Sequence, residues 1–353
     1  MIDMRALGAS GLKTPRLVLG GNVFGWTVET AGSGAVLEGF IERGGTMIDT
    51  ADVYSAWVPG HVGGESETAI GDWLARRGRR DDVLIATKVG MLPGDGGTGL
   101  KPERIAAAVD ASLKRLRTDY IDLYYAHRDD PDTPVADVLG AFSRLVEAGK
   151  VRALGASNFT AERLAESLDF SAANGLAAYT VLQPELNLIR RDGFAGDLQA
   201  LCIDRELGVL PYYGLASGFL TGKYRPGADL TQSQRGSRVA GYFNAHGWAV
   251  LAALDTVARE TGATPAQVAL AWNAAQPGVT APIASATSMA QLEELAGAMT
   301  LDLSAAQLAM LDEASLDQAC PRPTGAASRT SRPSITIRSP APISRSAVAT
   351  ESR

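Results

Sequence analysis

Residues 46–55 read TMIDTADVYS, and residues 83–90 read VLIATKVG. Each stretch opens with a short apolar run rich in β-branched side chains, and a helix-length segment separates the two. This pattern is typical of strands that are buried on both faces of a parallel sheet. The run YIDLYYAH at residues 120–127 repeats it after another helix-length segment. We therefore expect a parallel α/β sheet, with a polar residue where each of these strands ends.

The same alternation of strands and helices extends over most of the chain. Residues 101–117 read KPERIAAAVDASLKRLR, in which Ile105, Val109 and Leu113 fall on one helical stripe and Pro102 suits a first turn. Strand-like runs lie near residues 17–21, 46–49, 83–87, 120–126, 151–156, 179–183, 208–213 and 279–284. Eight such units, each of roughly 30 to 40 residues, predict a (β/α)8 TIM barrel, which we assign to residues 1–319.

A doubly wound open sheet is the alternative fold for such alternation. Dinucleotide-binding folds of that kind carry a G-x-G-x-x-G turn after the first strand. Residues 20–25 read GGNVFG instead, so this fingerprint is absent. The number of strand-like runs and the missing fingerprint both favour the barrel.

Three segments fall outside the alternation. Residues 4–21, MRALGASGLKTPRLVLGG, predict an N-terminal β-hairpin that plugs the floor of the barrel. The long connection at residues 213–247 is rich in Gly, Ser, Arg and aromatic residues, and long loops of this kind tend to be functional. Residues 320–353 are rich in Ser, Arg and Pro with little apolar periodicity, which predicts a disordered tail.

The bulk properties restrict the partners that the protein can have. A net charge of −6 argues against nucleic-acid or anionic-membrane binding, since both need a concentrated basic surface. There are only two cysteines, and we find neither a leader sequence nor an apolar run near the ~20 residues of a membrane span, so we expect a cytoplasmic protein. The three histidines are scattered, which predicts no metal site. A small molecule is the expected partner.

Four polar residues at the strand ends carry the chemistry of the predicted site. In a barrel, Asp49, Lys88 and His127 share the carboxyl-terminal rim, where the active sites of such enzymes lie, and Tyr54 follows in the next loop. A free phenol has a pKa of ~10 and is a weak acid until a nearby charge stabilises its anion. Lys88 supplies that charge, Asp49 holds the ammonium, and His127 is placed to hydrogen-bond a reacting oxygen. Because side chains do not carry hydride, reduction at this site requires a nicotinamide cofactor.

Seven motifs resemble those of the aldo-keto reductase superfamily, from about residue 5 to about residue 315. In chain order they are IDTADVY, ATK, DLYYAH, GASNF, LQPELN, ASGFLTGKY and TAPIASATSMAQLEEL. The resemblance implies that Asp49, Tyr54, Lys88 and His127 are the catalytic tetrad, with Tyr54 as general acid in reduction and general base in oxidation.

The resemblance also implies a set of cofactor and substrate contacts. The nicotinamide carboxamide would meet Ser157, Asn158 and Gln183, Tyr212 would stack on the ring, and Gly21 and Asn22 would line the nicotinamide pocket. The residues implied at the pyrophosphate are Leu215, Gly218, Leu220 and Lys223; those at the adenosine phosphate are Ile283, Ser285, Thr287, Gln291 and Glu294; those at the substrate are Phe24, Trp26 and Trp57. Gly20 and Gly21 can alternatively serve only to turn the chain off its strand.

The resemblance implies NADP as the expected cofactor. NAD stays open, because no Arg or Lys near Thr287 is available to hold a 2′-phosphate and Leu295 stands where relatives often have Asn. Tyr213 and Gly214 also replace the Ser-Pro pair that is common after the stacking tyrosine.

The sequence therefore predicts an NADP(H)-dependent oxidoreductase that reduces an aldehyde or ketone, or oxidises the alcohol, by hydride transfer. Two alternatives remain. Lys88 could act as a Schiff-base nucleophile in an aldolase-like barrel, although a carboxylate beside it would keep the lysine charged. The chain could also be a nicotinamide-sensing regulatory protein with slow or no turnover.

Overall fold

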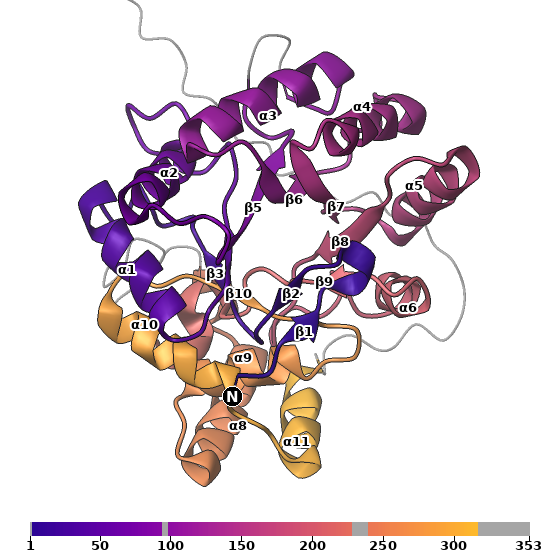
Figure 1. Ribbon diagram of the computed structural model, residues 1–353. Helices are drawn as coiled ribbons and strands as arrows, with labels where there is room; N and C mark the ends of the chain where they lie inside the picture. Colours follow the sequence, from indigo (N-terminus) through magenta and orange to yellow (C-terminus); the bar gives the residue numbers. More distant parts are fainter. Residues whose placement is uncertain (1, 94–97, 228–238, 317–353) are drawn as a thin grey trace, which may run out of the picture. The chain divides into compact units, whose positions relative to one another are not determined.

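In the part of the chain that the structure describes, eight parallel strands form the inner wall, which is seen end-on in Figure 1. This computed structural model describes residues 2–93, 98–227 and 239–316. The strands are β3 (Val18–Gly20), β4 (Met47–Asp49), β5 (Leu84–Val89), β6 (Ile121–Ala126), β7 (Val151–Ser157), β8 (Tyr179–Gln183), β9 (Gly208–Val209) and β10 (Ile283–Ala284). Their order in the sheet is β10-β3-β4-β5-β6-β7-β8-β9, so neighbours in space are neighbours in sequence except at β10. The predicted (β/α)8 barrel is confirmed.

The barrel closes between its last two strands through backbone hydrogen bonds. The amide of Thr280 donates to the carbonyl of Val209 over 2.9 Å, and the amide of Ile283 donates to the carbonyl of Pro211 over 2.8 Å. The runs predicted at residues 208–213 and 279–284 yield regular strands of only two residues each. A proline inside each run, at 211 and at 282, has no N–H to donate, which interrupts the ladder.

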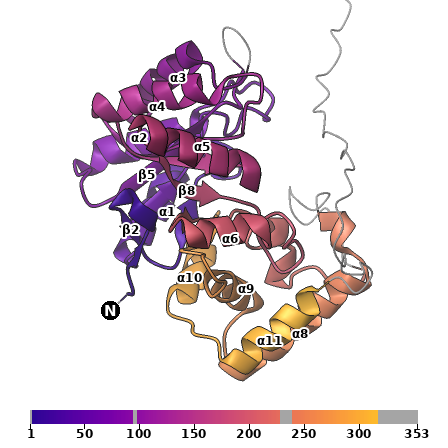
Figure 2. The same cartoon turned by 90° about the vertical axis from the view of Figure 1, so that its right-hand side faces the viewer.

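Helices surround the barrel on its outer side (Figures 1 and 2). They are α1 (Thr30–Glu42), α2 (Glu65–Arg77), α3 (Pro102–Leu116), α4 (Val135–Glu147), α5 (Ala161–Asn174), α6 (Asp197–Asp204), α8 (Ala245–Thr261), α9 (Pro265–Ala274), α10 (Met289–Ala296) and α11 (Ala305–Ser315). The helix predicted around Pro102 is α3, and its buried face includes Ile105 and Val109. In Figure 2, α8 and α11 lie side by side at the edge of the barrel, where they pack against each other. None of the described helices is both long and apolar enough to cross a membrane.

Side-chain caps fix the starts of two of the late helices. At α9 the Thr264 hydroxyl accepts from the amide of Gln267, and the Gln267 side chain accepts from the amide of Thr264. Ser304 and Gln307 make the same reciprocal pair at α11. Each capping box satisfies two amide groups that the first turn of a helix leaves without partners.

The predicted N-terminal hairpin is present and covers the amino-terminal end of the barrel. Strands β1 (Arg5–Ala6) and β2 (Lys13–Thr14) pair antiparallel around the 3-10 turn η1 (Gly8–Ser10). The hairpin contributes Leu7 and Leu12 to the apolar cluster inside the barrel, which also contains Val18, Met47, Ala86, Leu123, Tyr125, Ala153, Val181, Leu210, Ala281 and Ile283. The hairpin therefore closes the end of the barrel opposite to the predicted site.

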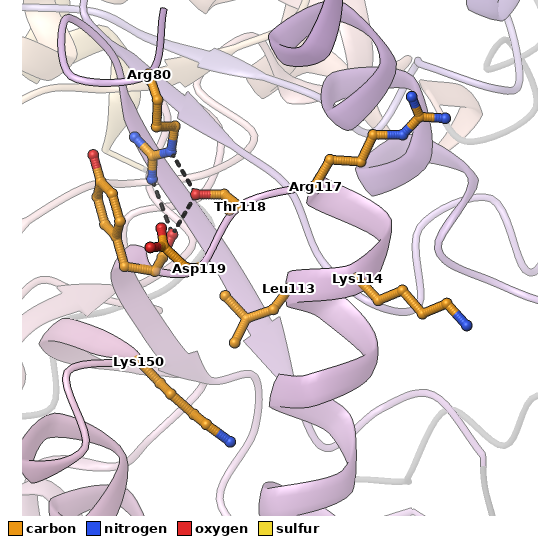
Figure 3. A pocket seen from close by; sticks show the side chains of 8 residues that line it. Arg80, Leu113, Lys114, Arg117, Thr118, Asp119 and Lys150 are labelled. Atoms are coloured by element: carbon orange, nitrogen blue, oxygen red, sulfur yellow. Dashed lines mark hydrogen bonds between the residues drawn. The ribbon is translucent and has the colours of Figure 1, made fainter.

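The same amino-terminal end also carries a shallow hollow of about 750 Å³ (Figure 3). It is lined in part by Arg80 and Thr118, whose loops lead into β5 and β6. The Arg80 guanidinium donates to the Thr118 hydroxyl over 3.2 Å and to the buried Asp122 carboxylate over 2.6 Å. These bonds hold two strand-entry loops together, which is a structural role.

The predicted long connection contains short helical turns within its described residues. Leaving β9, the chain forms the 3-10 turn η2 (Ala216–Thr221), and after residue 238 it forms η4 (Ala240–Tyr242) and enters α8. Another 3-10 turn, η5 (Gly297–Met299), follows α10. The disordered tail predicted for residues 320–353 lies outside the described residues and stays a prediction, as does the boundary at residue 319.

Gly71 in α2 provides a test of how tightly the outer helices pack. A Cβ added there would overlap the backbone carbonyl of Arg115 in α3, and backbone atoms cannot give way cheaply. Gly71→Ala should therefore lower the free energy of unfolding by about 1–3 kcal/mol in urea titrations. Gly140 in α4 is the matched control, since its nearest neighbour is the flexible end of Arg144 at 3.6 Å. Gly140→Ala should raise stability by up to about 1 kcal/mol through helix propensity, and equal effects of both changes would contradict this packing.

Candidate active site

The centre of the predicted site is the ammonium group of Lys88, whose side chain is fully buried near the carboxyl end of β5. Burying such a charge costs several kcal/mol unless it is paired and hydrogen-bonded. Its Nζ donates to Asp49 Oδ2 over 2.6 Å, to the backbone carbonyl of Thr50 over 2.8 Å and to Tyr54 Oη over 3.0 Å. All three donor positions of the ammonium are therefore used, and one of them meets the phenol.

The charge state of this group reflects two opposing effects. Burial lowers the pKa of Lys88 below its usual 10.5, and the adjacent Asp49 carboxylate raises it again in part. The other carboxylate oxygen of Asp49 accepts from the side-chain amide of Gln183 over 2.8 Å. With both of its oxygens bonded, Asp49 is fixed in place and holds the ammonium against the Tyr54 hydroxyl.

His127 joins the group from the end of β6. Its backbone amide donates to the carbonyl of Val89 over 2.9 Å, and its ring centre lies 6.1 Å from that of Tyr54. Burial lowers the pKa of the imidazole well below its usual 6.5, and the positive charges of Lys88 and Arg128 lower it further. The imidazole is therefore neutral at pH 7. Its Nδ1 is buried without a hydrogen-bond partner in the described residues.

A second set of predicted residues is hydrogen-bonded to this group along the ends of β7 and β8. The Asn158 amide donates to the His127 carbonyl over 2.9 Å, and the Tyr212 hydroxyl donates to Asn158 Oδ1 over 2.8 Å. Ser157 Oγ donates to the Gln183 carbonyl over 2.9 Å. Ser157 and Gln183 are buried, whereas Asn158 is exposed. The four residues predicted to bind the carboxamide or stack on the nicotinamide ring thus lie together beside the tetrad.

A third set joins the first and last strands of the barrel. Ser285 Oγ, after β10, donates to Asn22 Oδ1 over 2.6 Å. The amide of Gly21 donates to the carbonyl of Asp49 over 2.7 Å, and an added Cβ at Gly21 would lie 3.0 Å from that oxygen. The close approach explains a glycine at this position, whatever its part in cofactor binding.

The residues predicted at the pyrophosphate lie in and around η2. Ala216, Ser217 and Gly218 all have left-handed backbones, with φ of 45°, 57° and 94°. Such conformations are strained for residues other than glycine and tend to occur at binding sites. Lys223 is exposed and Leu215 is half-buried, whereas the side chain of Leu220 is fully buried and could offer only its backbone.

The residues predicted at the adenosine phosphate lie along β10, the loop that follows it and α10. Gln291 Oε1 accepts from both the amide and the hydroxyl of Thr287, over 2.8 and 2.9 Å. Both residues are exposed, whereas Ile283 is buried in β10 and the backbone carbonyl of Glu294 accepts from Gln267. Thr287 and Gln291 are therefore the exposed members of this set, and Ser285 and Glu294 are half-buried.

The aromatic residues predicted at the substrate fall into two groups. Trp57 is 44% exposed, and its ring centre lies 6.1 Å from Tyr54 and 5.5 Å from Trp26, edge to face in both cases. Trp26 and Trp57 therefore form a continuous aromatic wall with Tyr54, the candidate proton donor. Phe24, in contrast, is fully buried in the core of the protein, so its side chain meets other apolar groups.

The structure adds residues that the sequence analysis did not select. Ser66 Oγ donates to the carbonyl of Gly21 over 2.7 Å and lies 2.8 Å from Thr50 Oγ1, so it ties the first two strand ends together. Glu67 and Asp52 are buried carboxyl groups behind the site. A signal existed in the sequence, because Ser66 and Glu67 precede Ala69, Ile70 and Trp73 on the buried face of α2. Polar residues on an apolar helix face indicate buried polar contacts.

A (β/α)8 barrel with a buried lysine–carboxylate pair, a phenol and a neutral imidazole at its carboxyl-terminal rim has the construction of an acid–base enzyme. The chain belongs to the aldo/keto reductase family, whose sequence profile matches residues 16–316. It is accordingly an oxidoreductase of the aldo-keto reductase type.

Three similar proteins span most of the chain. A probable voltage-gated potassium channel subunit beta of Arabidopsis thaliana is 32% identical over 303 residues, which cover 83% of this chain and 90% of that protein. Aldo-keto reductase str7 of Strobilurus tenacellus is 36% identical and covers 72% of this chain and 74% of its own length. Aldo-keto reductase yakc of Schizosaccharomyces pombe, whose name specifies NADP(+), is 32% identical, with 79% and 81% covered.

The neutral state of His127 predicts a specific dependence of stability on pH. Because the folded protein depresses the pKa of this imidazole, the unfolded chain takes up a proton below about pH 6.5 that the folded protein does not. The contribution of His127 to stability is present above that pH and is lost on acidification, by up to about 1.4 kcal/mol per pH unit. The free energies of unfolding of the wild type and His127→Asn, measured in urea between pH 8 and pH 5, should converge as the pH falls. Parallel curves would mean that His127 titrates alike in both states.

Proposed function

We propose that the protein is an NADP(H)-dependent reductase of small aldehydes or ketones, and that it also oxidises the corresponding alcohols. The observation that carries this proposal is the 3.0 Å hydrogen bond from the buried Lys88 ammonium to the hydroxyl of Tyr54. A phenol that already receives a hydrogen bond from a cation can release its own proton to another acceptor, because its anion is stabilised at once.

In the proposed reaction Tyr54 is the proton donor. The Tyr54 O–H donates to the carbonyl oxygen of the substrate, and as hydride adds to the carbonyl carbon and negative charge develops on that oxygen, the proton moves to it. The phenolate left behind stays beside Lys88 Nζ, which Asp49 and the Thr50 carbonyl hold in position. In the oxidation direction the same phenolate takes the proton of the alcohol.

His127 serves as a neutral hydrogen-bonding group in this proposal. An imidazolium beside Tyr54 would compete as the acid, but burial and the nearby cations keep the ring uncharged. A neutral ring nitrogen that carries a proton can donate a hydrogen bond to the carbonyl oxygen and orient it toward Tyr54 without taking part in proton transfer. The backbone of His127 is fixed by the bonds from Asn158 and to Val89.

The arrangement of Lys88 argues against a Schiff-base mechanism. A nucleophilic lysine needs a free lone pair, which requires the amine to be deprotonated. Here the Nζ atom donates to three oxygens at 3.0 Å or less, one of them a carboxylate. These acceptors favour the ammonium form, so Lys88 is better suited to electrostatic support.

The residues around the tetrad fit a nicotinamide cofactor. Bound there, the cofactor supplies the hydride that the side chains lack. Asn158 presents an exposed amide beside the tetrad, and its bond from Tyr212 holds the tyrosine ring at the rim. An amide acceptor and a flat aromatic face are the groups that would orient a carboxamide-bearing ring. The left-handed backbone of η2 suits close approach to the pyrophosphate.

NADP is the proposed cofactor, with NAD as the alternative. Support comes from the similar yakc reductase, whose name specifies NADP(+). The accessible polar groups of Thr287 and Gln291 lie at the start of α10, and a helix start favours anions. Titrating the protein with NADPH and with NADH, and following quenching of its tryptophan fluorescence, should give the tighter binding for NADPH. Tighter binding of NADH would reverse this preference and leave the reductase proposal intact.

Replacing Tyr54 with Phe tests the proposed function. Tyr54→Phe removes the proton donor and leaves the aromatic wall, so carbonyl reduction should fall by about 10²–10⁴-fold. Tyr120→Phe is the matched control. Tyr120 lines the hollow at the opposite end of the barrel, so this variant should keep the wild-type rate of carbonyl reduction. Turnover would be followed by cofactor absorbance with a panel of aldehydes and ketones, and cofactor affinity by fluorescence quenching.

The two readouts separate chemistry from binding. Cofactor affinity should be nearly equal in the wild type, Tyr54→Phe and Tyr120→Phe. Undiminished turnover in Tyr54→Phe would end the proposed role of this residue. Tight cofactor binding with no turnover by the wild type on any carbonyl compound would instead favour a nicotinamide-sensing protein.

A further inference from the structure

A second buried carboxyl group lies directly behind the candidate active site. Asp52 belongs to the loop that follows β4, between Asp49 and Tyr54, and only 1% of its surface is exposed. Its backbone amide donates to the carbonyl of Lys88 over 3.3 Å, so the loop is tied to β5 at the residue that carries the ammonium. A change at Asp52 therefore acts on the segment that positions Tyr54.

Asp52 differs from the buried Glu67 beside it in how its oxygens are satisfied. Glu67 accepts from the Thr87 hydroxyl over 2.6 Å and from the Arg115 guanidinium over 2.6 Å, one bond to each oxygen. Both oxygens of Asp52 are buried without a hydrogen-bond partner of good geometry in the described residues, although the backbone amide of the adjacent Val53 lies near enough to lower the pKa of Asp52 slightly. An ionised carboxylate in that situation costs several kcal/mol, whereas a neutral carboxylic acid costs much less.

The nearest cation, the guanidinium of Arg104, makes no hydrogen bond to Asp52. The Nη2 atom of Arg104 in α3 lies 3.9 Å from Asp52 Oδ2, beyond hydrogen-bond distance, and donates instead to the backbone carbonyl of Leu92. Its Nε is buried, and no described residue makes a hydrogen bond to it. The guanidinium thus stands between two acceptors, Leu92 on the loop after β5 and Asp52 on the loop after β4.

Every neighbouring strand or helix contributes a charged or titratable group to this region. The strands contribute Asp49 from β4, Lys88 from β5 and Tyr124 from β6. The helices contribute Glu67 from α2, and Arg104 and Arg115 from α3. Burial and the negative charge of Glu67 raise the pKa of Asp52 to about 7, and Arg104, Arg115 and the Val53 amide offset this only in part. Burial keeps Tyr124 neutral, since its pKa lies well above 10.

We propose that Asp52 is a positioning residue for the proton-donating tyrosine, active as a neutral carboxylic acid. When Asp52 is protonated, the loop from Asp49 to Tyr54 packs against Lys88, and Arg104 donates to the Leu92 carbonyl. When Asp52 loses its proton to solvent, the new carboxylate attracts Arg104 away from Leu92. It also adds a negative charge behind the site, which opposes the Tyr54 phenolate that forms during reduction. The catalytic part of this inference rests on the proposed function.

The first test is the pH profile of kcat for carbonyl reduction. In the wild type, kcat should fall on the alkaline side with a midpoint near 7, as one proton is lost. Asp52→Asn keeps the shape of the neutral acid but cannot ionise, so its kcat should stay level within about twofold between pH 6 and pH 8. Asp81→Asn, at an exposed aspartate before β5, is the matched control and should keep the wild-type profile. Parallel profiles for the wild type and Asp52→Asn would overturn the proposal.

A second variant tests the direction of the effect. Arg104→Met removes a cation that favours the ionised form of Asp52 while keeping an unbranched stem in α3. The alkaline limb of kcat should therefore move to higher pH. If Asp52 had a purely structural role, the midpoint of the alkaline limb would not move. A shift of that midpoint to lower pH would contradict the electrostatic coupling.

A direct measurement on the wild-type protein needs no turnover. Infrared difference spectra of the chain labelled with carbon-13 at the aspartate carboxyl should show a protonated acid that titrates near pH 7 and is missing in Asp52→Asn. The absence of that band in the wild type would overturn the inference even if Asp52→Asn failed to fold. If the Asp52 band titrates near pH 7 but the protein reduces no carbonyl compound, the result would instead count against the reductase proposal and against the proposed effect of Asp52 on kcat.

Discussion

The buried ammonium of Lys88 is the constraint on which the rest of the site depends. A fully buried lysine at a strand end would destabilise the barrel if it stood alone, because its charge would have lost its hydration. Asp49, the Thr50 carbonyl and Tyr54 replace that hydration with three short contacts. Removing any of these partners would therefore disturb both the stability of the rim and the electrostatic environment of the phenol.

The amino-terminal end of the barrel contributes mainly to stability, and the carboxyl-terminal end carries the candidate active site. At the amino-terminal end, Leu7 and Leu12 of the hairpin complete the apolar interior, and Arg80 joins two strand-entry loops through Asp122 and Thr118. At the carboxyl-terminal end, polar atoms such as His127 Nδ1 and the oxygens of Asp52 are buried without hydrogen-bond partners among the described residues. Unsatisfied groups of this kind lower stability, and they persist where a protein needs titratable or binding groups.

Much of the fold could be predicted from local sequence patterns. Short apolar runs separated by helix-length amphipathic segments gave the order of strands and helices, because burial on both faces of a parallel sheet demands such runs. The prediction overestimated the regular strands around Pro211 and Pro282, where missing N–H groups break the ladder although the chain continues in the same direction. It also did not anticipate the packing of α8 against α11, since nothing local links residues so far apart.

By itself, the amino-acid sequence determined the strand–helix periodicity, the polar residues at the strand ends and the motifs that mark the family. These are properties of neighbouring residues, so they can be read from the linear order. Only the tertiary structure decided that the Gln183 amide would hold Asp49, that Phe24 would be buried in the core, and that Asp52 would face Arg104 without a hydrogen bond. Each of these contacts joins separate elements of the barrel, and their distances depend on how strands and helices pack around it.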